Sequence, residues 1–248
     1  MKISCLTITQ FSRINLLKRS LHSFSLQTFE PSLRELIIVH HDAPQFTFEI
    51  EKLLSEYKIN AKIVDVAKAP LGELRNISIE SASGDLLCQW DDDDFYHPDR
   101  LKIQAEPFEV NGCVATTLEM QMFWFCKDGD LYIRKGGKEG LHGSIMFRSD
   151  RGLLYQKNLS KGEDTFLIQE IMAQGPLSIY RIDGQPQLYV RTYHGENTWN
   201  SEHHYSHIRQ SLSTDWLKTN KNVIKKWIKE LNIAPVNVRS ADNLIFSI

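Results

Sequence analysis

Short apolar runs alternate with amphipathic segments along the first 100 residues. The runs are rich in Ile, Leu and Val, as buried strands are, and the segments between them repeat apolar residues at helical spacing. The predicted strands are residues 3–9, 35–39, 61–66 and 85–90, and the predicted helices are residues 15–25, 48–58 and 71–82. Because this alternation is typical of βαβ units, we expect an α/β fold on a parallel sheet.

The pattern becomes less regular after residue 100. It predicts strands at residues 114–125, 144–148 and 187–193 and a helix at residues 164–173, separated by glycine-bearing loops. We expect one main domain over residues 1–200, with a first half at 1–100 and a mixed half at 101–200. A C-terminal helical extension is expected at 201–248.

Within that extension, residues 205–231 carry tryptophan and aliphatic side chains at helical spacing with lysines between them. The pattern predicts a basic amphipathic helix or helix pair. One interpretation is that its apolar face packs on the domain, as such faces usually do. The alternative is peripheral contact with a membrane, where tryptophan and lysine together are favoured.

Composition narrows the class of protein. A net charge of -2 and a pI near 6.5 argue against a nucleic-acid partner, because such domains usually have a marked basic excess. Cys5, Cys88, Cys113 and Cys126 form no CxxC pair, so neither a zinc knuckle nor a disulfide framework is indicated. The N-terminal apolar run is too short for a signal peptide, and no run approaches about 18 apolar residues. We expect a cytoplasmic protein, with the inner face of the membrane as a second location.

Four consecutive aspartates, Asp91 to Asp94, follow the apolar run at 86–88. Like charges side by side need a counter-charge, and this run lies between a buried strand and Pro98, which suits the first turn of a helix. In an extended segment Asp91 and Asp93 share one face, while Asp92 and Asp94 point elsewhere. An Asp-x-Asp unit at a strand end indicates a site for Mg²⁺ or Mn²⁺ with a phosphate-bearing substrate.

The acidic run is part of a longer series of motifs. Before it lie Leu71-Gly72-Glu73-Leu74-Arg75-Asn76 and Ala82-Ser83-Gly84-Asp85, and after it lies His97-Pro98-Asp99-Arg100-Leu101. The series resembles the family 2 glycosyltransferases of the GT-A fold, over roughly residues 1–200. The resemblance implies a Rossmann-like, mostly parallel central sheet flanked by helices, with a mixed acceptor-side half and C-terminal helices.

The resemblance also implies a nucleotide-sugar donor and a divalent cation, Mn²⁺ or Mg²⁺. Asp91 is then expected near the ribose or sugar, and Asp93 on the cation, with His194 as a further ligand. Arg75 is expected near the donor; its alternative is an exposed helix arginine. The other residues expected on the donor side are Thr9, Phe11, Arg13, His41, Asp65 and Asp92.

A second motif, Lys161-Gly162-Glu163-Asp164, resembles the family's Glu-Asp pair at the start of a helix. By that match Asp164 is the general base that takes the proton from the acceptor hydroxyl, and the product is inverted. The alternative is that Asp164 only caps the helix. Glu163, His142 and Trp199 are expected on the acceptor side.

The sequence departs from the family after the second strand, where His40-His41-Asp42-Ala43 replaces a usual Asp-Asp-Gly-Ser turn. UDP is the favoured carrier, and the acceptor is expected to be a glycan or lipid-linked sugar of cell-surface polysaccharide synthesis. Adjacent strand side chains face opposite ways, so His40 and His41 do not suggest a second metal site. Two alternatives stay open: a sugar nucleotidyltransferase, although residues 1–30 hold no glycine-rich phosphate loop, and a non-catalytic glycan-binding scaffold.

Overall fold

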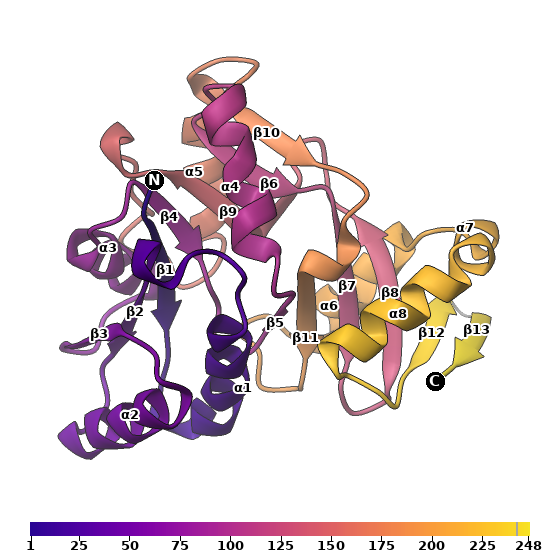
Figure 1. Cartoon of the computed structure of the whole chain (residues 1–248), viewed down its shortest axis with the longest axis horizontal. Helices are drawn as coiled ribbons and strands as arrows, with labels where there is room; N and C mark the ends of the chain where they lie inside the picture. The colour runs from indigo at the N-terminus through magenta and orange to yellow at the C-terminus, as the bar shows by residue number, and fades with distance from the viewer. Residues whose placement is uncertain (242) are drawn as a thin grey trace.

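The computed structural model describes residues 1–241 and 243–248, which form two β-sheets side by side (Figure 1). The first sheet has the order β10-β6-β9-β4-β1-β2-β3, and every pair is parallel except those that β9 makes. Its strands are β1 (Ile3–Ile8), β2 (Arg34–His40), β3 (Ala61–Asp65), β4 (Leu86–Gln89), β6 (Ala115–Leu118), β9 (Leu141–Arg148) and β10 (Ile179–Ile182). The expected α/β fold with a mostly parallel sheet is confirmed.

Helices cover both faces of this sheet, as the alternating sequence pattern requires. One core cluster joins it to α1 (Ile14–Ser25), α2 (Pro44–Tyr57) and α4 (Arg100–Val110). A second cluster, on the other face, joins it to α3 (Leu71–Ser81) and α5 (Glu163–Ala173). The sheet is therefore buried on both sides, which explains why its strands are apolar runs without alternation.

The second sheet has the order β13-β12-β8-β7-β11-β5 among the described residues. Its strands are β5 (Phe95–Tyr96), β7 (Met120–Phe125), β8 (Asp130–Lys135), β11 (Tyr189–Tyr193), β12 (Asn237–Ser240) and β13 (Asn243–Ser247). The single strand predicted at 114–125 is wrong, because the chain changes sheets at Glu119, between β6 and β7. Both strands are apolar and buried, so no change of periodicity marks the break.

The C-terminal residues fold onto the second sheet. Helices α6 (Ser201–Ser206), α7 (Thr214–Thr219) and α8 (Lys221–Leu231) are followed by β12, which pairs with β8. The expectation of a purely helical extension is therefore wrong. Helix α8 lies over this sheet (Figure 1), and its Ile224, Ile228 and Leu231 are buried in the core. The packing interpretation of the amphipathic pattern is confirmed, and this apolar face is not available to a membrane. No helix in the described part of the chain has the length and hydropathy needed to span a bilayer.

The Ser83-Gly84 turn fixes the start of β4 against β1 and β2. A Cβ atom on Gly84 would lie 2.7 Å from the backbone nitrogen of Ser4, so only glycine fits. The Glu35 carboxylate accepts hydrogen bonds from Ser83 N at 2.7 Å, Ser4 Oγ at 2.6 Å and Lys2 Nζ at 2.6 Å. Burial alone would raise the pKa of Glu35, but these hydrogen bonds outweigh it and lower the pKa to about 2.

The lowered pKa predicts how Glu35 contributes to acid stability. Its pKa is lower in the folded state than in the unfolded state, so its stabilisation is fully present above about pH 5 and is lost as the pH falls toward about 2. We expect Glu35→Gln to lower the free energy of unfolding by about 1–2 kcal/mol at pH 7 and by much less at pH 2.5. Urea denaturation at both pH values measures this, with exposed Glu49→Gln as the control. An equal loss at both pH values would contradict the assignment.

Candidate active site

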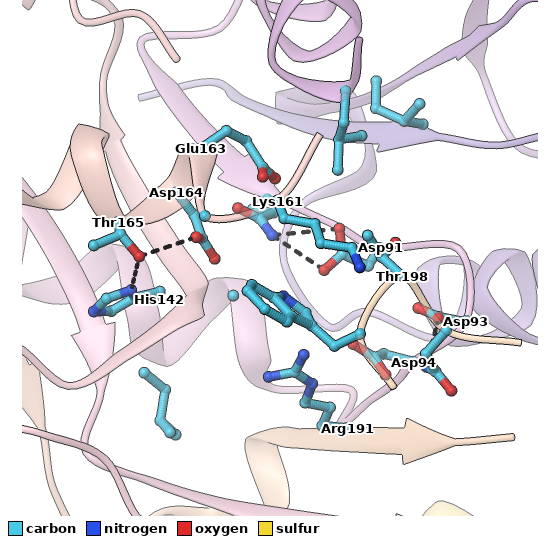
Figure 2. A pocket seen from close by; sticks show the side chains of 18 of the residues that line it. Asp91, Asp93, Asp94, His142, Lys161, Glu163, Asp164, Thr165, Arg191 and Thr198 are labelled. Carbon is cyan, nitrogen blue, oxygen red and sulfur yellow. Dashed lines mark hydrogen bonds between the residues drawn. The ribbon is translucent and has the colours of Figure 1, made fainter. Parts of the chain in front are cut away.

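A cleft of about 600 Å³ opens at the carboxyl ends of β1 and β4. The first sheet contributes Thr9 and the four aspartates, and the N-terminus of α5 contributes Glu163 and Asp164. In Figure 2, Glu163 and Asp164 lie on one side of the cleft and Asp91, Asp93 and Asp94 on the other. Strand ends of an open α/β sheet are the usual place for a ligand, so the topology agrees with the position of the cleft.

Two of the four aspartates hold the turn in place. Asp92 is 1% exposed and accepts a hydrogen bond from the Thr9 hydroxyl at 2.7 Å. Asp94 is 3% exposed and accepts from the Tyr189 hydroxyl at 2.6 Å and from Thr192 N at 2.8 Å. The side chain of Asp91, by contrast, is 25% exposed toward the cleft. The expected alternation of an extended segment is wrong, because residues 91–94 form a turn in which all four aspartates line the cleft.

Arg13 supplies part of the counter-charge that the acidic run needs. Its Nη2 lies 2.7 Å from Asp92 Oδ1 and 2.5 Å from Asp93 Oδ2. Burial would raise the pKa of Asp93, but His194 and Arg13 outweigh it and lower the pKa to about 2, so Asp93 is ionised. Burial raises the pKa of Asp92 to about 7 even though Arg13 opposes that shift. The two neighbours therefore differ in charge state near neutral pH.

Arg75 joins the acidic turn to α5. It is 6% exposed, so the alternative of an exposed helix arginine is wrong. Its Nη2 lies 3.0 Å from Asp91 Oδ1, and its Nε lies 3.0 Å from Glu163 Oε1. Next to it, the Asn76 side chain donates to Tyr155 O and accepts from Tyr155 N, both at 2.8 Å. The Arg-Asn pair thus fixes two segments that are far apart in the sequence.

The Glu-Asp pair begins α5, but Asp164 does not cap the helix. The N-cap is Gly162, with φ of 75°, and no side-chain capping bond forms there. The capping alternative for Asp164 is therefore wrong. Asp164 Oδ1 lies 3.5 Å from Thr165 Oγ1, which in turn lies 3.2 Å from His142 Nδ1 (Figure 2). The Asp164 carboxylate lines the cleft without a close ion pair among the described residues.

Most of the predicted site residues lie together. Those that line the cleft are Thr9, Arg13, His41, Arg75, Asp91, Asp92, Asp93, His142, Glu163, Asp164 and Trp199. Phe11, Asp65 and His194 do not. Phe11 turns outward and packs edge-on against Phe46, with ring centroids 5.6 Å apart. Asp65 ends the edge strand β3 with its side chain 46% exposed.

The sequence alone assigned no role to several residues of the second sheet that line the cleft. Arg191 and Tyr189 are alternate residues of β11 and both line the cleft, where Figure 2 shows Arg191. This alternation along the strand was the sequence signal that could have identified Arg191. Gln121 on β7 and Arg134 on β8 also line the cleft. His203 and His207, from the C-terminal residues, line it as well. They reach the cleft only because the chain changes sheets at Glu119.

Asp93 and His194 are residues that could bind a divalent cation, and Arg13 Nη2 pairs with the same Asp93 oxygen. His194 Nε2 lies 3.2 Å from Asp93 Oδ2, a separation suited to neighbouring ligands of one ion with bonds of about 2.1 Å. Among the described residues no three His, Cys, Asp or Glu side chains converge on one point. A cation at Asp93 would thus take most of its other ligands from substrate phosphates or water, which is usual for Mg²⁺.

The acidic turn at the strand ends lies opposite the helix-borne Glu-Asp pair, as expected for a GT-A glycosyltransferase. Residues 5–123 match the family described as "Glycosyl transferase family 2". The uncharacterized glycosyltransferase YwdF of Bacillus subtilis is 32% identical over 123 residues, which cover 50% of this chain and 44% of YwdF. Residues 5–123 thus match glycosyltransferase family 2, and the chain spans less than half the length of this curated relative.

Two solved structures illustrate the likeness of the fold. Staphylococcus aureus TarS 1-349 in complex with UDP-GlcNAc matches with a TM-score of 0.65 and 16% identity, covering 84% of this chain and 65% of that one. The mannosyltransferase PcManGT from Pyrobaculum calidifontis, in complex with GDP-Man and Mn²⁺, matches with a TM-score of 0.61 and 10% identity, covering 94% and 68%. At these identities the matches show the GT-A fold.

The Arg75 bridge predicts a stability effect. Arg75→Met leaves the carboxylates of Asp91 and Glu163 without their shared cation, and Glu163 is 4% exposed. We expect the free energy of unfolding to fall by about 3 kcal/mol, and Arg75→Lys to recover part of it because one ammonium can still pair. Urea denaturation measures this, with exposed Arg209→Met as the matched control. If the two Met variants unfold alike, the bridge is not structurally important.

Proposed function

We propose that the protein is an inverting, metal-dependent glycosyltransferase that moves a sugar from a nucleotide-diphosphate sugar to a hydroxyl group. The observation that carries the proposal is that Asp164 lines the same cleft as the Asp91–Asp93 turn, with Arg75 bridging Asp91 to Glu163. A donor bound over the strand ends would thus have a carboxylate on the side of its anomeric carbon away from the diphosphate.

The donor half of the cleft is charged in the way a nucleoside diphosphate needs. Thr9, His41, Arg75 and Asp91 surround the place expected for the nucleotide and sugar. Asp93, with His194 beside it, would hold Mn²⁺ or Mg²⁺. When bound, that cation neutralises charge on the leaving diphosphate. UDP is the proposed carrier, in line with the UDP-GlcNAc bound to TarS.

Asp164 acts in the chemical step. As the bond between the anomeric carbon and the diphosphate oxygen breaks, the acceptor oxygen forms its bond on the opposite face. The acceptor proton passes to Asp164, and the configuration at the anomeric carbon is inverted. A carboxylate of ordinary basicity is adequate, because the hydroxyl becomes acidic late in an oxocarbenium-like transition state. Arg75 and Arg191 add fixed positive charge beside the developing anion.

The acceptor side carries Glu163, His142 and Trp199. The Trp199 ring stacks on His203 with centroids 4.2 Å apart, and Lys161 Nζ lies 5.3 Å from its centroid. Such a rim suits the apolar face of a sugar ring. We propose a glycan or lipid-linked acceptor in cell-surface polysaccharide synthesis, reached from the cytoplasm.

Asp164→Asn tests the role of the base. We expect kcat for release of UDP from a UDP-sugar to fall at least about 100-fold, while the Kd of UDP stays within about twofold, because Asn cannot take the proton. Exposed Asp150→Asn is the control, and NMR of the product gives its anomeric configuration. Near-normal turnover by Asp164→Asn, or a product with retained configuration, would refute the mechanism.

A further inference from the structure

The far wall of the cleft holds a buried cation that has no counter-ion among the described residues. Arg134 on β8 is 5% exposed and lines the cleft. Its Nη1 donates to Gln210 Oε1 at 2.7 Å and lies 3.2 Å from His207 Nδ1. When the Gln121 amide is oriented with its oxygen toward the Arg134 guanidinium, that oxygen accepts hydrogen bonds from Arg134 Nε at 2.9 Å and Nη2 at 3.2 Å. These bonds leave one N–H of Nη2 for a ligand.

All of these partners are neutral. Burial and the nearby Arg134 lower the pKa of His207 to about 3, so its ring carries no charge at neutral pH. No carboxylate oxygen of a described residue lies within 4.0 Å of the Arg134 nitrogens. Burial, together with the nearby Arg191 guanidinium, lowers the pKa of Arg134 to about 9. An isolated buried charge is costly, so this arrangement is unfavourable unless a ligand completes it.

A second buried arginine, Arg100, has the contacts typical of a structural role. Arg100 is 0% exposed and also has no acidic partner, but its guanidinium donates to Gln89 O and lies over three aromatic rings at 4.4–5.4 Å. It does not line the cleft. Arg134 has one ring within reach, Phe123 at 5.9 Å, and it opens onto the cleft. The environment of Arg134 therefore resembles an anion site more than a core contact.

Three carboxylates of the cleft have partners other than Arg134. Asp94 accepts from Tyr189 and Thr192, Glu163 pairs with Arg75, and Glu139 Oε1 lies 3.2 Å from His142 Nε2. Arg134 also comes from the second sheet, across the cleft from the strand ends of β1 and β4. A negative group that reaches it would belong to the molecule that enters from the acceptor side.

We propose that the acceptor carries an anionic group, a phosphate or a carboxylate, which Arg134 binds. This inference rests on the proposed function, since it assigns the second sheet to the acceptor. Arg191 and Lys161 line the same cleft and add positive charge around the group. Arg134 is then a specificity-determining residue: it selects an anionic acceptor over a neutral glycan of the same size.

Probe binding tests the proposal. Glycerol 3-phosphate and glucuronate are titrated into the full chain by NMR, against glycerol and glucose, with saturating UDP and Mn²⁺ to fill the donor side. We expect at least one anionic probe to bind at least tenfold tighter than its neutral counterpart. Arg134→Met should abolish that preference and Arg134→Lys should keep part of it. Which probe binds distinguishes a phosphate from a carboxylate.

Two results would overturn the proposal: anionic and neutral probes that bind the wild type equally, or Arg134→Met that binds the anionic probe like the wild type. The thermal midpoint is a further readout, with Arg209→Met as the matched control. Because the charge is uncompensated, Arg134→Met should melt within a few degrees of the wild type; a loss above about 10 °C would show a structural role and also refute the proposal. UDP binding is measured in the same samples, so failure of the donor site is distinguished from failure of the anion site.

Discussion

The ion pairs of Arg75 hold the cleft together. One guanidinium on α3 pairs with Asp91 at the end of β4 and with Glu163 at the start of α5. Four adjacent aspartates would repel one another without such compensation, and Arg13 and Arg191 complete it from two other segments. The acidic turn can be this dense because its counter-charges are built into elements distant in sequence. Donor-side and base-side carboxylates are thereby fixed relative to each other.

The two sheets divide the chemistry between them. The first sheet presents the acidic turn at its strand ends, as open α/β sheets commonly do. The second sheet closes the cleft with β7, β8 and β11, and α8 buries its apolar face behind those strands. Residues such as Arg134 and Arg191 therefore reach the cleft from a part of the chain beyond the family match at residues 5–123. Under the proposed function, this half is where acceptor specificity can vary without changing the donor site.

Much of the first half could be predicted from the sequence, because strong local signals agree there with the tertiary fold. The strands β1 to β4 and helices α1 to α3 lie within a few residues of the expected ranges. Helix α4 was missed because Pro107 lies inside it and its apolar residues follow no clear helical period. The change of sheet at Glu119 and the strands β12 and β13 could not be predicted. They depend on which sheet each segment joins, and a local sequence pattern holds no information on that.

The site residues could be predicted to a similar extent: those in contiguous motifs were identified from the sequence, and those that depend on the tertiary fold were not. Asp91, Asp93 and Asp164 were found because their motifs are contiguous, and the structure brings them to one cleft. Phe11 and Asp65 were expected there and are not, since the short helix Phe11–Arg13 turns the phenyl ring outward and β3 ends at the sheet edge. The role proposed for Arg134 depends on the absence of a described acid near it in three dimensions, which cannot be derived from a sequence.

The central claim is that the acidic turn binds the diphosphate of a nucleotide sugar through a divalent cation. Calorimetric titration of UDP, GDP, CDP and TDP, with and without Mn²⁺, tests it most directly on the wild type, Asp93→Ala and exposed Asp150→Ala. The predicted result is Mn²⁺-dependent binding of one nucleotide, UDP, that is lost in Asp93→Ala and kept in Asp150→Ala. Binding of no nucleotide, or binding that survives Asp93→Ala unchanged, would contradict it.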